Sequence, residues 1–170
     1  MFGTVKSLRE LFELQLRYAY DCEQKLFDKG IPSMLESATS ADLRGALQGH
    51  LRETQHQIAR LDQIFALVGV EASTKDNDIL DELVNAAEDS VSNIESSDLR
   101  DAALIVNGNL VEHYEIALYG SLAAFARSLG LQPAVDLLEE SLQEEKNADK
   151  KLTQIAETVM NPKAARRHSA

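Results

Sequence analysis

Three side chains that could do acid–base or metal chemistry lie together in residues 109–119, which read Asn-Leu-Val-Glu-His-Tyr-Glu-Ile-Ala-Leu-Tyr. They are Glu112, His113 and Glu115, and they fall within one turn of a segment whose flanks are almost entirely apolar or small. A helix that is apolar on most of its surface belongs in the interior of a protein. Buried carboxylates are unfavourable unless they are paired, protonated or bound to a metal. The segment therefore predicts a partner for these acids elsewhere in the chain.

Acidic residues at the centres of other helical segments are the candidate partners. Glu53 follows Glu23 by 30 residues, and Glu145 follows Glu115 by 30 residues. This equal spacing is a weak internal repeat, in which two helical hairpins carry acids at equivalent heights. Asp149 follows Glu145 by about one helical turn and lies on the same face. We expect these carboxylates to converge at the middle of a helical bundle.

A convergence of carboxylates from four helices is typical of one kind of metal site. Ferritin-like proteins hold two iron or manganese ions with one Glu from each of two helices and a Glu with a nearby ligand from each of the other two. Carboxylate oxygens suit such ions and partly offset their charge. The cofactors expected are therefore two iron ions, with manganese as the alternative. Glu112 is either a further ligand or an acid that holds His113, which is more typical of a core histidine than of a ligand.

The nitrogen ligand is harder to assign. Glu53 and His56 have the Glu-x-x-His spacing that is usual in such sites. At about 100° per residue, however, His56 lies about 140° from the centre of the apolar stripe of its helix, whereas His50 and Gln57 lie within about 40° of it. Glu53 lies at the edge of the stripe. We therefore favour Glu53, with His50 or Gln57 nearby, over His56, and the choice among His50, His56, Gln57 and His113 stays open.

The elements that position these side chains are all expected to be helices. Leu, Ala, Glu and Gln are abundant, and no segment alternates apolar and polar residues as a strand does. Capping residues and helix breakers delimit the segments: Gly30 and Pro32 are expected to end the first helix, and Gly69 and Gly130 two later ones. The predicted helices are residues 4–29, 39–68, 79–94, 97–129 and 132–159.

The connections between these helices predict a topology. Short loops join the first two long helices and the last two, so each pair is antiparallel, and residues 79–94 form an extra short helix inside a long link between the pairs. We predict an all-α fold: a ferritin-like antiparallel four-helix bundle with one long crossover. Residues 1–160 form this domain, and residues 161–170, which are basic, form a flexible tail.

Composition excludes several classes of function. The chain of 170 residues has a net charge of −11 and a pI near 4.8, which argues against binding nucleic acid or an anionic membrane surface. Its single cysteine, Cys22, cannot form an internal disulfide, so a reducing compartment, the cytoplasm, is expected. No apolar run is long enough for a membrane span, and the first residues lack a signal-peptide core.

Several longer motifs resemble one bacterial family, the YciF/YciE-type ferritin-like proteins associated with stress responses. The motifs are His50-Leu-Arg-Glu-Thr, Arg60-Leu-Asp-Gln-Ile-Phe, Asp101-Ala-Ala-Leu-Ile, Val111-Glu-His-Tyr-Glu-Ile-Ala-Leu-Tyr-Gly and Leu142-Gln-Glu-Glu-Lys-Asn-Ala-Asp-Lys-Lys-Leu-Thr. The resemblance spans residues 4–158 and implies a five-helix ferritin-like fold, a homodimer and a carboxylate site like that of rubrerythrin. Carried over, the metal-facing set is Glu23, Glu53, Glu112, Glu115, Glu145 and Asp149.

Two functions of different classes follow. The preferred one is a di-metal carboxylate protein that reacts with O2 or peroxide, or handles iron, and takes electrons from an external donor because the chain has no further cysteines for an iron–sulfur or rubredoxin-like centre. Whether it is an enzyme is left open. The alternative is a helical dimerisation or scaffold protein without redox chemistry, favoured by Ala148, which stands where a Glu-x-x-His pair starting at Glu145 would place histidine.

Overall fold

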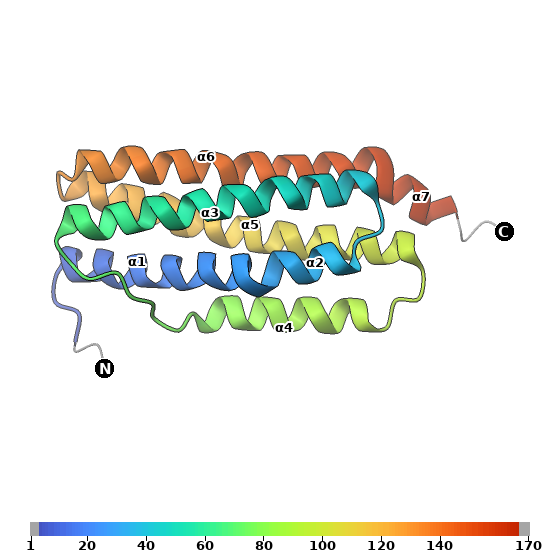
Figure 1. The fold of residues 1–170 in the computed structure, drawn as a ribbon, viewed down its shortest axis with the longest axis horizontal. Helices are drawn as coiled ribbons and strands as arrows, with labels where there is room; N and C mark the ends of the chain where they lie inside the picture. Colours follow the sequence, from blue (N-terminus) through green and yellow to red (C-terminus); the bar gives the residue numbers. More distant parts are fainter. Residues whose placement is uncertain (1–3, 167–170) are drawn as a thin grey trace.

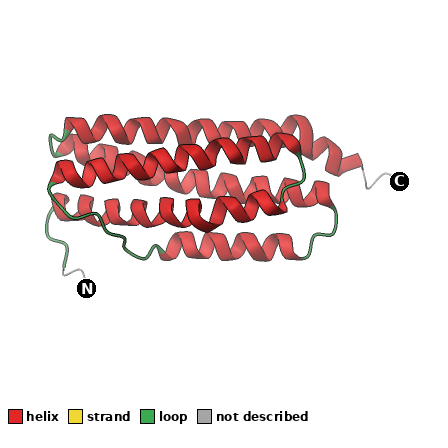
Figure 2. Ribbon diagram, in the orientation of Figure 1, coloured by secondary structure: helices red, strands yellow, loops and turns green. Residues whose placement is uncertain are grey.

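The computed structural model describes residues 4–166, and all regular structure within them is helical, as predicted (Figures 1 and 2). The elements in chain order are α1 (Leu8–Lys25), a π-helical turn (Leu26–Gly30), α2 (Ile31–Ser37), α3 (Ala41–Val68), α4 (Asp78–Ser92), α5 (Ser97–Ser128), α6 (Gln132–Ile155), a second π-helical turn (Ala156–Met160) and α7 (Asn161–Arg166). Among these residues, no helix combines the length and the hydropathy needed to cross a bilayer.

Four long helices pack side by side along most of the molecule (Figure 1). In the figure, α1 and α6 run in one direction, and α3 and α5 run in the other. The contacts join α1 to α3, α3 to α6, α6 to α5 and α5 to α1, so that the four helices surround one interior. Helix α4 lies outside this group and packs along α5. The interior at mid-height is therefore reached by side chains from every one of the long helices.

Several helix ends follow from their capping residues. The side chain of Ser7 accepts a hydrogen bond from the backbone N–H of Glu10 and begins α1. Gly69 and Gly130 adopt positive φ angles of 74° and 72° just after α3 and α5, as the sequence predicted. The start of α3 has a less obvious cap: the buried carboxylate of Asp101, on α5, accepts bonds from the backbone N–H groups of Thr39 and Ser40. Asp101 thereby ties the start of α3 to α5.

Two prolines lie within helical stretches that continue past them, and one of them, Pro32, was predicted to end its helix. Pro32 follows the first π-helical turn and Pro162 follows the second, and in both places the helix continues. The proline ring clashes with the carbonyl group four residues earlier in an α-helix. A π-helical turn bonds to the fifth residue back instead, and Ile31 N–H donates to Leu26 O while Asn161 N–H donates to Ala156 O. The widened turns thus let the chain pass each proline.

The C-terminal segment is more ordered than the sequence predicted. Residues 161–166 form α7, and the side chain of Ala164 is buried. These residues were expected to belong to a flexible tail. The rest of that predicted tail, residues 167–170, lies outside the residues that the structure describes, and the domain boundary at residue 160 stays a prediction.

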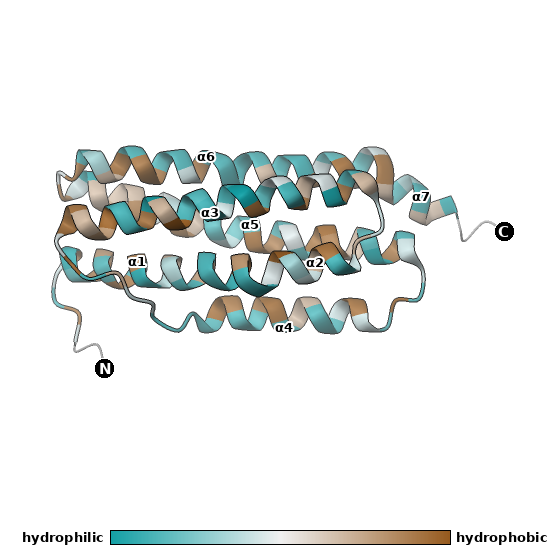
Figure 3. Cartoon of the chain, in the orientation of Figure 1, coloured by the Kyte–Doolittle hydropathy of each residue, from teal (hydrophilic) through white to brown (hydrophobic). Residues whose placement is uncertain are grey.

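The core consists of two apolar clusters, one toward each end of the molecule. The first includes Phe12, Leu61 and Leu138, and the second includes Leu43, Leu104 and Leu152. Buried polar and acidic side chains lie between them. Figure 3 shows the same change along α3, whose middle is hydrophilic while hydrophobic residues occupy both of its ends. This polar layer inside the bundle is the candidate functional site.

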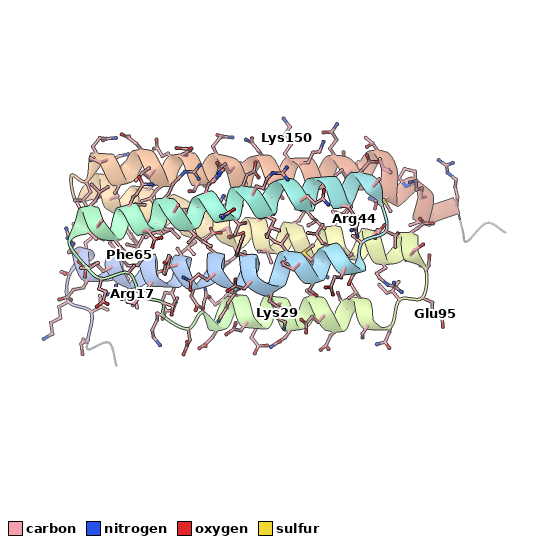
Figure 4. All side chains as sticks on the ribbon, viewed as in Figure 1. Arg17, Lys29, Arg44, Phe65, Glu95 and Lys150 are labelled. Atoms are coloured by element: carbon pink, nitrogen blue, oxygen red, sulfur yellow. The ribbon has the colours of Figure 1, made fainter. Side chains whose placement is uncertain are left out.

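The side-chain view separates the interior from the outer surface (Figure 4). Phe65 lies between α3 and α1 and is 1% exposed. Its ring stacks edge-on against Tyr20 and receives the guanidinium group of Arg17 at 5.7 Å. Lys150 points away from α6 into solvent. The acids of the polar layer therefore sit among apolar neighbours and not on a hydrated face.

Candidate metal centre

One group of side chains has the geometry of a metal site. Each member offers one potential ligand atom, and these atoms all lie within 4.8 Å of one another. All members of the group are buried. The group comprises His50 from α3, Glu112 and Glu115 from α5, and Glu145 from α6. Imidazole nitrogen combined with carboxylate oxygens suits iron, manganese and similar divalent ions. The sequence had singled out all four of these residues.

The helical register explains why these residues meet. On α5, Gly108, Glu112, Glu115 and Tyr119 recur at intervals of four, three and four residues and are all buried, so they form one inward stripe. On α3, the inward stripe passes through His50, Thr54, Gln57 and Leu61. On α6, it includes Ser141, Glu145 and Leu152. The polar members of these stripes lie at one height, and the apolar members continue above and below.

Glu23 adjoins this group on the α1 side. Its side chain is 1% exposed, and its Oε1 accepts a hydrogen bond of 2.6 Å from the hydroxyl of Tyr119. Glu115 is a close neighbour, because the negative charge of Glu23 adds to burial in raising the pKa of Glu115. The thiol of Cys22 donates to Glu115 Oε1 at 3.8 Å. Glu115 thus lies between Glu23 on one side and the other members of the group on the other.

A chain of polar side chains holds Glu145 in place. Gln57 Nε2 donates to Glu145 Oε1 and, at 3.0 Å, to Glu144 Oε2. Arg60 donates to both carboxylate oxygens of Glu144 at 2.7 Å and to Glu140 at 2.6 Å. Fixed outer partners of this kind orient the ligands of metal sites. The periodicity pointed to Gln57 but not to Arg60 or Glu144. Arg60 follows Gln57 by three residues, and this spacing was the signal that placed it near the same face of α3.

The interior contains more hydrogen-bonding atoms than it can satisfy. Seven buried atoms in this layer have no hydrogen-bond partner among the described residues: Glu23 Oε2, His50 Nδ1, Thr54 Oγ1, Gln57 Oε1, Glu112 Oε2, Glu115 Oε2 and Glu145 Oε2. A buried polar atom without a partner destabilises a protein by about 1–3 kcal/mol. Four of the seven are carboxylate oxygens, and oxygens of this type are ligands for hard cations. The residues present therefore fit a bound metal ion.

Burial also shifts the protonation of these acids. It raises the pKa values of Glu23, Glu112 and Glu115 well above the ordinary value, and raises that of Glu145, because a charged carboxylate is poorly solvated there. The neighbouring negative charge of Glu145 raises the pKa values of the other three further. The interior therefore favours the protonated form of these acids. A cation would replace these protons.

Two of the predicted site residues do not lie in the buried group. The side chain of Glu53 is 44% exposed, and its Oε2 lies 3.7 Å from His50 Nδ1, outside the cluster. Asp149 is 24% exposed and lies 3.2 Å from His113 Nε2. The periodicity placed Glu53 at the edge of its stripe, and the packing of α3 buries His50, Thr54 and Gln57 while it leaves Glu53 partly exposed.

The helical register also determines where the remaining histidines lie. His113 is 70% exposed, so its interpretation as a core histidine was wrong. It follows Glu112 directly on α5, and consecutive residues of a helix point about 100° apart. His56 is exposed on α3, as its position relative to the apolar stripe predicted. His50 is therefore the one histidine among the described residues that reaches the cluster: its Nε2 lies 3.3 Å from Glu112 Oε1 and 3.9 Å from Glu145 Oε2.

Together, the fold and the cluster define a class: an all-helical protein with a buried carboxylate–imidazole site between its long helices. The chain belongs to the family described as domain of unknown function, DUF892, whose model matches residues 7–165. The protein YciF of Escherichia coli strain K12 is 36% identical over 164 residues, which cover 94% of this chain and 96% of that relative. The resemblance to the YciF/YciE-type family is thereby confirmed.

Solved structures of relatives share the fold. A protein of Rhodopseudomonas palustris, YcfI, described as a candidate structural protein, matches with a TM-score of 0.87 and 40% identity over 90% of this chain and 98% of its own. The Escherichia coli stress protein YciF matches with a TM-score of 0.85 and 35% identity over 89% of this chain and 96% of its own. A protein of Xanthomonas campestris, 21% identical with a TM-score of 0.72 over 95% of this chain and 99% of its own, shares the fold.

Proposed function

We propose that this protein is a ferritin-like di-metal carboxylate protein that acts in a stress response. The observation that carries the proposal is the set of buried carboxylate oxygens without hydrogen-bond partners, gathered around His50. The antiparallel arrangement of α1, α3, α5 and α6, with α4 in the crossover, supports a ferritin-like bundle. The stress role rests on the relative from Escherichia coli, which is described as a stress protein.

The residues divide into two groups that would each hold one ion. His50, Glu112 and Glu145 would hold the first, and Glu23 would hold the second, with Glu115 between them. Two bound ferrous ions would supply one electron each, so that O2, two electrons and two protons give H2O2. Gln57 and Tyr119 orient Glu145 and Glu23 through the hydrogen bonds that they donate. The electrons that restore the reduced state would come from an external donor.

The assembly and location are part of the same proposal. We propose a homodimer in the cytoplasm. Val106 and Leu110 lie about one turn apart on α5. They are 60% and 53% exposed. A second copy of the chain covering this apolar face is the simplest use of it. The single buried thiol, Cys22, is compatible with a reducing compartment.

Elemental analysis of the purified protein tests the metal proposal. Protein from medium supplemented with iron and manganese should contain about two metal ions per chain. A Glu112→Gln/Glu145→Gln variant should lose them, whereas a Glu139→Gln/Glu157→Gln variant, altered at exposed acids of the same region, should keep them. Circular dichroism checks that all three remain helical. Wild-type protein that stays metal-free after anaerobic loading with Fe(II) would contradict the proposal.

A non-catalytic scaffold protein is the second candidate. It is favoured by Ala148, which stands where a second Glu-x-x-His histidine would be, and by the description of the Rhodopseudomonas palustris relative as a candidate structural protein. The same elemental analysis separates the two functions. A scaffold would carry no stoichiometric metal, and its assembly, measured by native mass spectrometry, would be unchanged in the Glu112→Gln/Glu145→Gln variant.

A further inference from the structure

An apolar pocket leads to the metal-binding cluster from the side of α4. It lies between α2, α4 and α5, has a volume of about 70 Å³, and its inner end is formed by His50 and Glu112. Most of its wall is apolar; the main contributors are Leu26, Ile31, Met34, Leu47, Val84 and Val91. The pocket therefore joins an apolar space directly to two of the proposed metal ligands.

A second passage, of different character, reaches the same two residues. A groove of about 310 Å³ between α3 and α6 is also lined by His50 and Glu112. Its other lining residues are mixed: Glu53, Asn147 and Lys151 are hydrophilic, whereas Ala46, Leu47 and Leu152 are apolar. Gly49 also lines this groove, and the space beside it is open, since a Cβ atom at that position would meet nothing within 4 Å. Ions and water can enter by this groove, so the apolar pocket is not needed for them.

The size and lining of the apolar pocket select its occupant. A water molecule held inside a protein needs 2–4 polar partners, whereas an apolar cavity of about 150 Å³ stays dry and binds benzene or xenon. A pocket of about half that volume admits one much smaller apolar molecule. We propose that this pocket binds dioxygen and delivers it to the His50–Glu112 side of the cluster, an inference that rests on the proposed di-metal function.

Specific contacts hold the walls of the pocket in place. Asn107 on α5 donates to the backbone carbonyl of Ala87 at 3.3 Å and to the hydroxyl of Ser90 at 2.9 Å, and thereby fixes α4. Lys29, labelled in Figure 4, pairs with Glu88 at 3.1 Å across the outer side of the pocket. These bonds hold α4 against α5 and close the outer side of the pocket.

Two alanines offer a matched pair of substitutions. Ala87 lines the apolar pocket and Ala148 lines the polar groove, and both are partly exposed residues within helices. Ala87→Leu should fill the pocket, and Ala148→Leu should narrow the groove by the same side-chain change. Circular dichroism and thermal unfolding check that both variants fold.

Xenon binding to metal-free protein tests the pocket itself. Xenon should occupy this pocket in crystals of the wild type and of Ala148→Leu under xenon pressure, and should be absent from Ala87→Leu. Xenon-129 chemical shifts measured in solution give the same comparison. Wild-type protein without xenon in this pocket would overturn the proposal, whether or not the protein binds metal.

Anaerobic loading with Fe(II) followed by mixing with O2 tests delivery. Ala87→Leu should bind as much Fe(II) as the wild type and oxidise it about tenfold more slowly. Ala148→Leu should instead slow the uptake of Fe(II) and leave the reaction with O2 unchanged. Xenon pressure should slow the O2 reaction of the wild type, which tests delivery even if Ala87→Leu does not fold.

The outcomes separate this inference from the proposed function. Oxidation at the wild-type rate in an Ala87→Leu variant that excludes xenon would show that dioxygen takes another route, and would overturn delivery through the pocket. Failure of the wild type to bind Fe(II) would overturn both the di-metal function and delivery. In that case, xenon in the pocket would still establish a binding site for a small apolar molecule.

Discussion

The two halves of the molecule contribute different chemistry to one interior. The N-terminal half, through α3, supplies the imidazole of His50 and the amide of Gln57. The C-terminal half, through α5 and α6, supplies the carboxyl groups of Glu112, Glu115 and Glu145. Glu23, on α1, adds one acid from the first half. The negative charge that would bind a cation is therefore concentrated in α5 and α6.

The contrast between Glu53 and Glu145 shows how this asymmetry arises. Both occupy the middle of a long helix, yet the side chain of Glu145 is fully buried and that of Glu53 is 44% exposed. On α3 the positions that face the interior are those of His50, Thr54 and Gln57, so Glu53 points to one side of them. Equal spacing along the chain does not make two residues equivalent when their helices differ in rotation.

The largest expected effect comes from removing charge in the C-terminal half. Glu145→Gln keeps the shape of the side chain and removes its charge, so the affinity for Fe(II) should fall by more than the roughly 10–100-fold loss that is typical when only a supporting residue is removed. Isothermal titration calorimetry under anaerobic conditions measures this change. The control is Glu139→Gln, an exposed acid of the same helix that pairs with Arg127, and it should bind as the wild type does. An unchanged affinity in Glu145→Gln would remove this residue from the site.

A smaller effect is expected in the N-terminal half. His50→Ala removes a nitrogen ligand and leaves the acids in place, so the affinity for Fe(II) should fall by at least about tenfold. His56→Ala, the matched control on the same helix, should have no effect because His56 is exposed. If the His56 variant lost metal and the His50 variant kept it, the usual Glu-x-x-His arrangement would be the correct one and the geometry described above would be wrong.

The buried acids also predict how the stability of the metal-free protein depends on pH. Their pKa values in the folded state lie above the ordinary value of 4.5, so the folded state binds more protons than the unfolded state above that pH. Stability is then fully present below about pH 4.5 and falls as pH rises through the folded pKa values, by about 1.4 kcal/mol per pH unit for each group that stays protonated only when folded.

Urea unfolding of metal-free protein at several pH values between about 5 and about 8 measures this slope. Glu115→Gln should flatten the curve, because glutamine does not titrate. Bound metal should flatten it too, since a cation replaces the protons. Stability that increases over this range in the metal-free protein would contradict the raised pKa values.

The smallest effect is expected at Glu53. Its carboxylate lies 3.7 Å from His50 Nδ1 and is partly exposed, so it can orient the imidazole but does not reach the cluster. Glu53→Gln should lower the affinity for Fe(II) by less than about tenfold. A loss as large as that of Glu145→Gln would show that α3 turns Glu53 inward when metal binds, and would make the two halves equivalent after all.

Several features of this protein could be predicted from its sequence alone. The helical periodicity, glycines at the ends of α3 and α5, and the absence of strand patterns led to an all-helical fold. The apolar surroundings of Glu112 and Glu115 revealed that acids would be buried, since local pattern reports directly which face of a helix is inward. The motifs around these residues also identified the family.

Other features were decided by tertiary structure. Gln57 faces the interior and Glu53 is partly exposed because of how α3 packs against its neighbours. The periodicity of a helix does not fix the orientation of its inward face to within a few tens of degrees. The helix continues past Pro32 because of a π-helical turn, which no residue pattern predicted. The apolar pocket and the polar groove exist because of how α4, α5 and α6 pack. The residue pattern of a single helix does not predict the spaces between helices. Sequence specified the side chains that could bind a metal, and packing decided which of them meet.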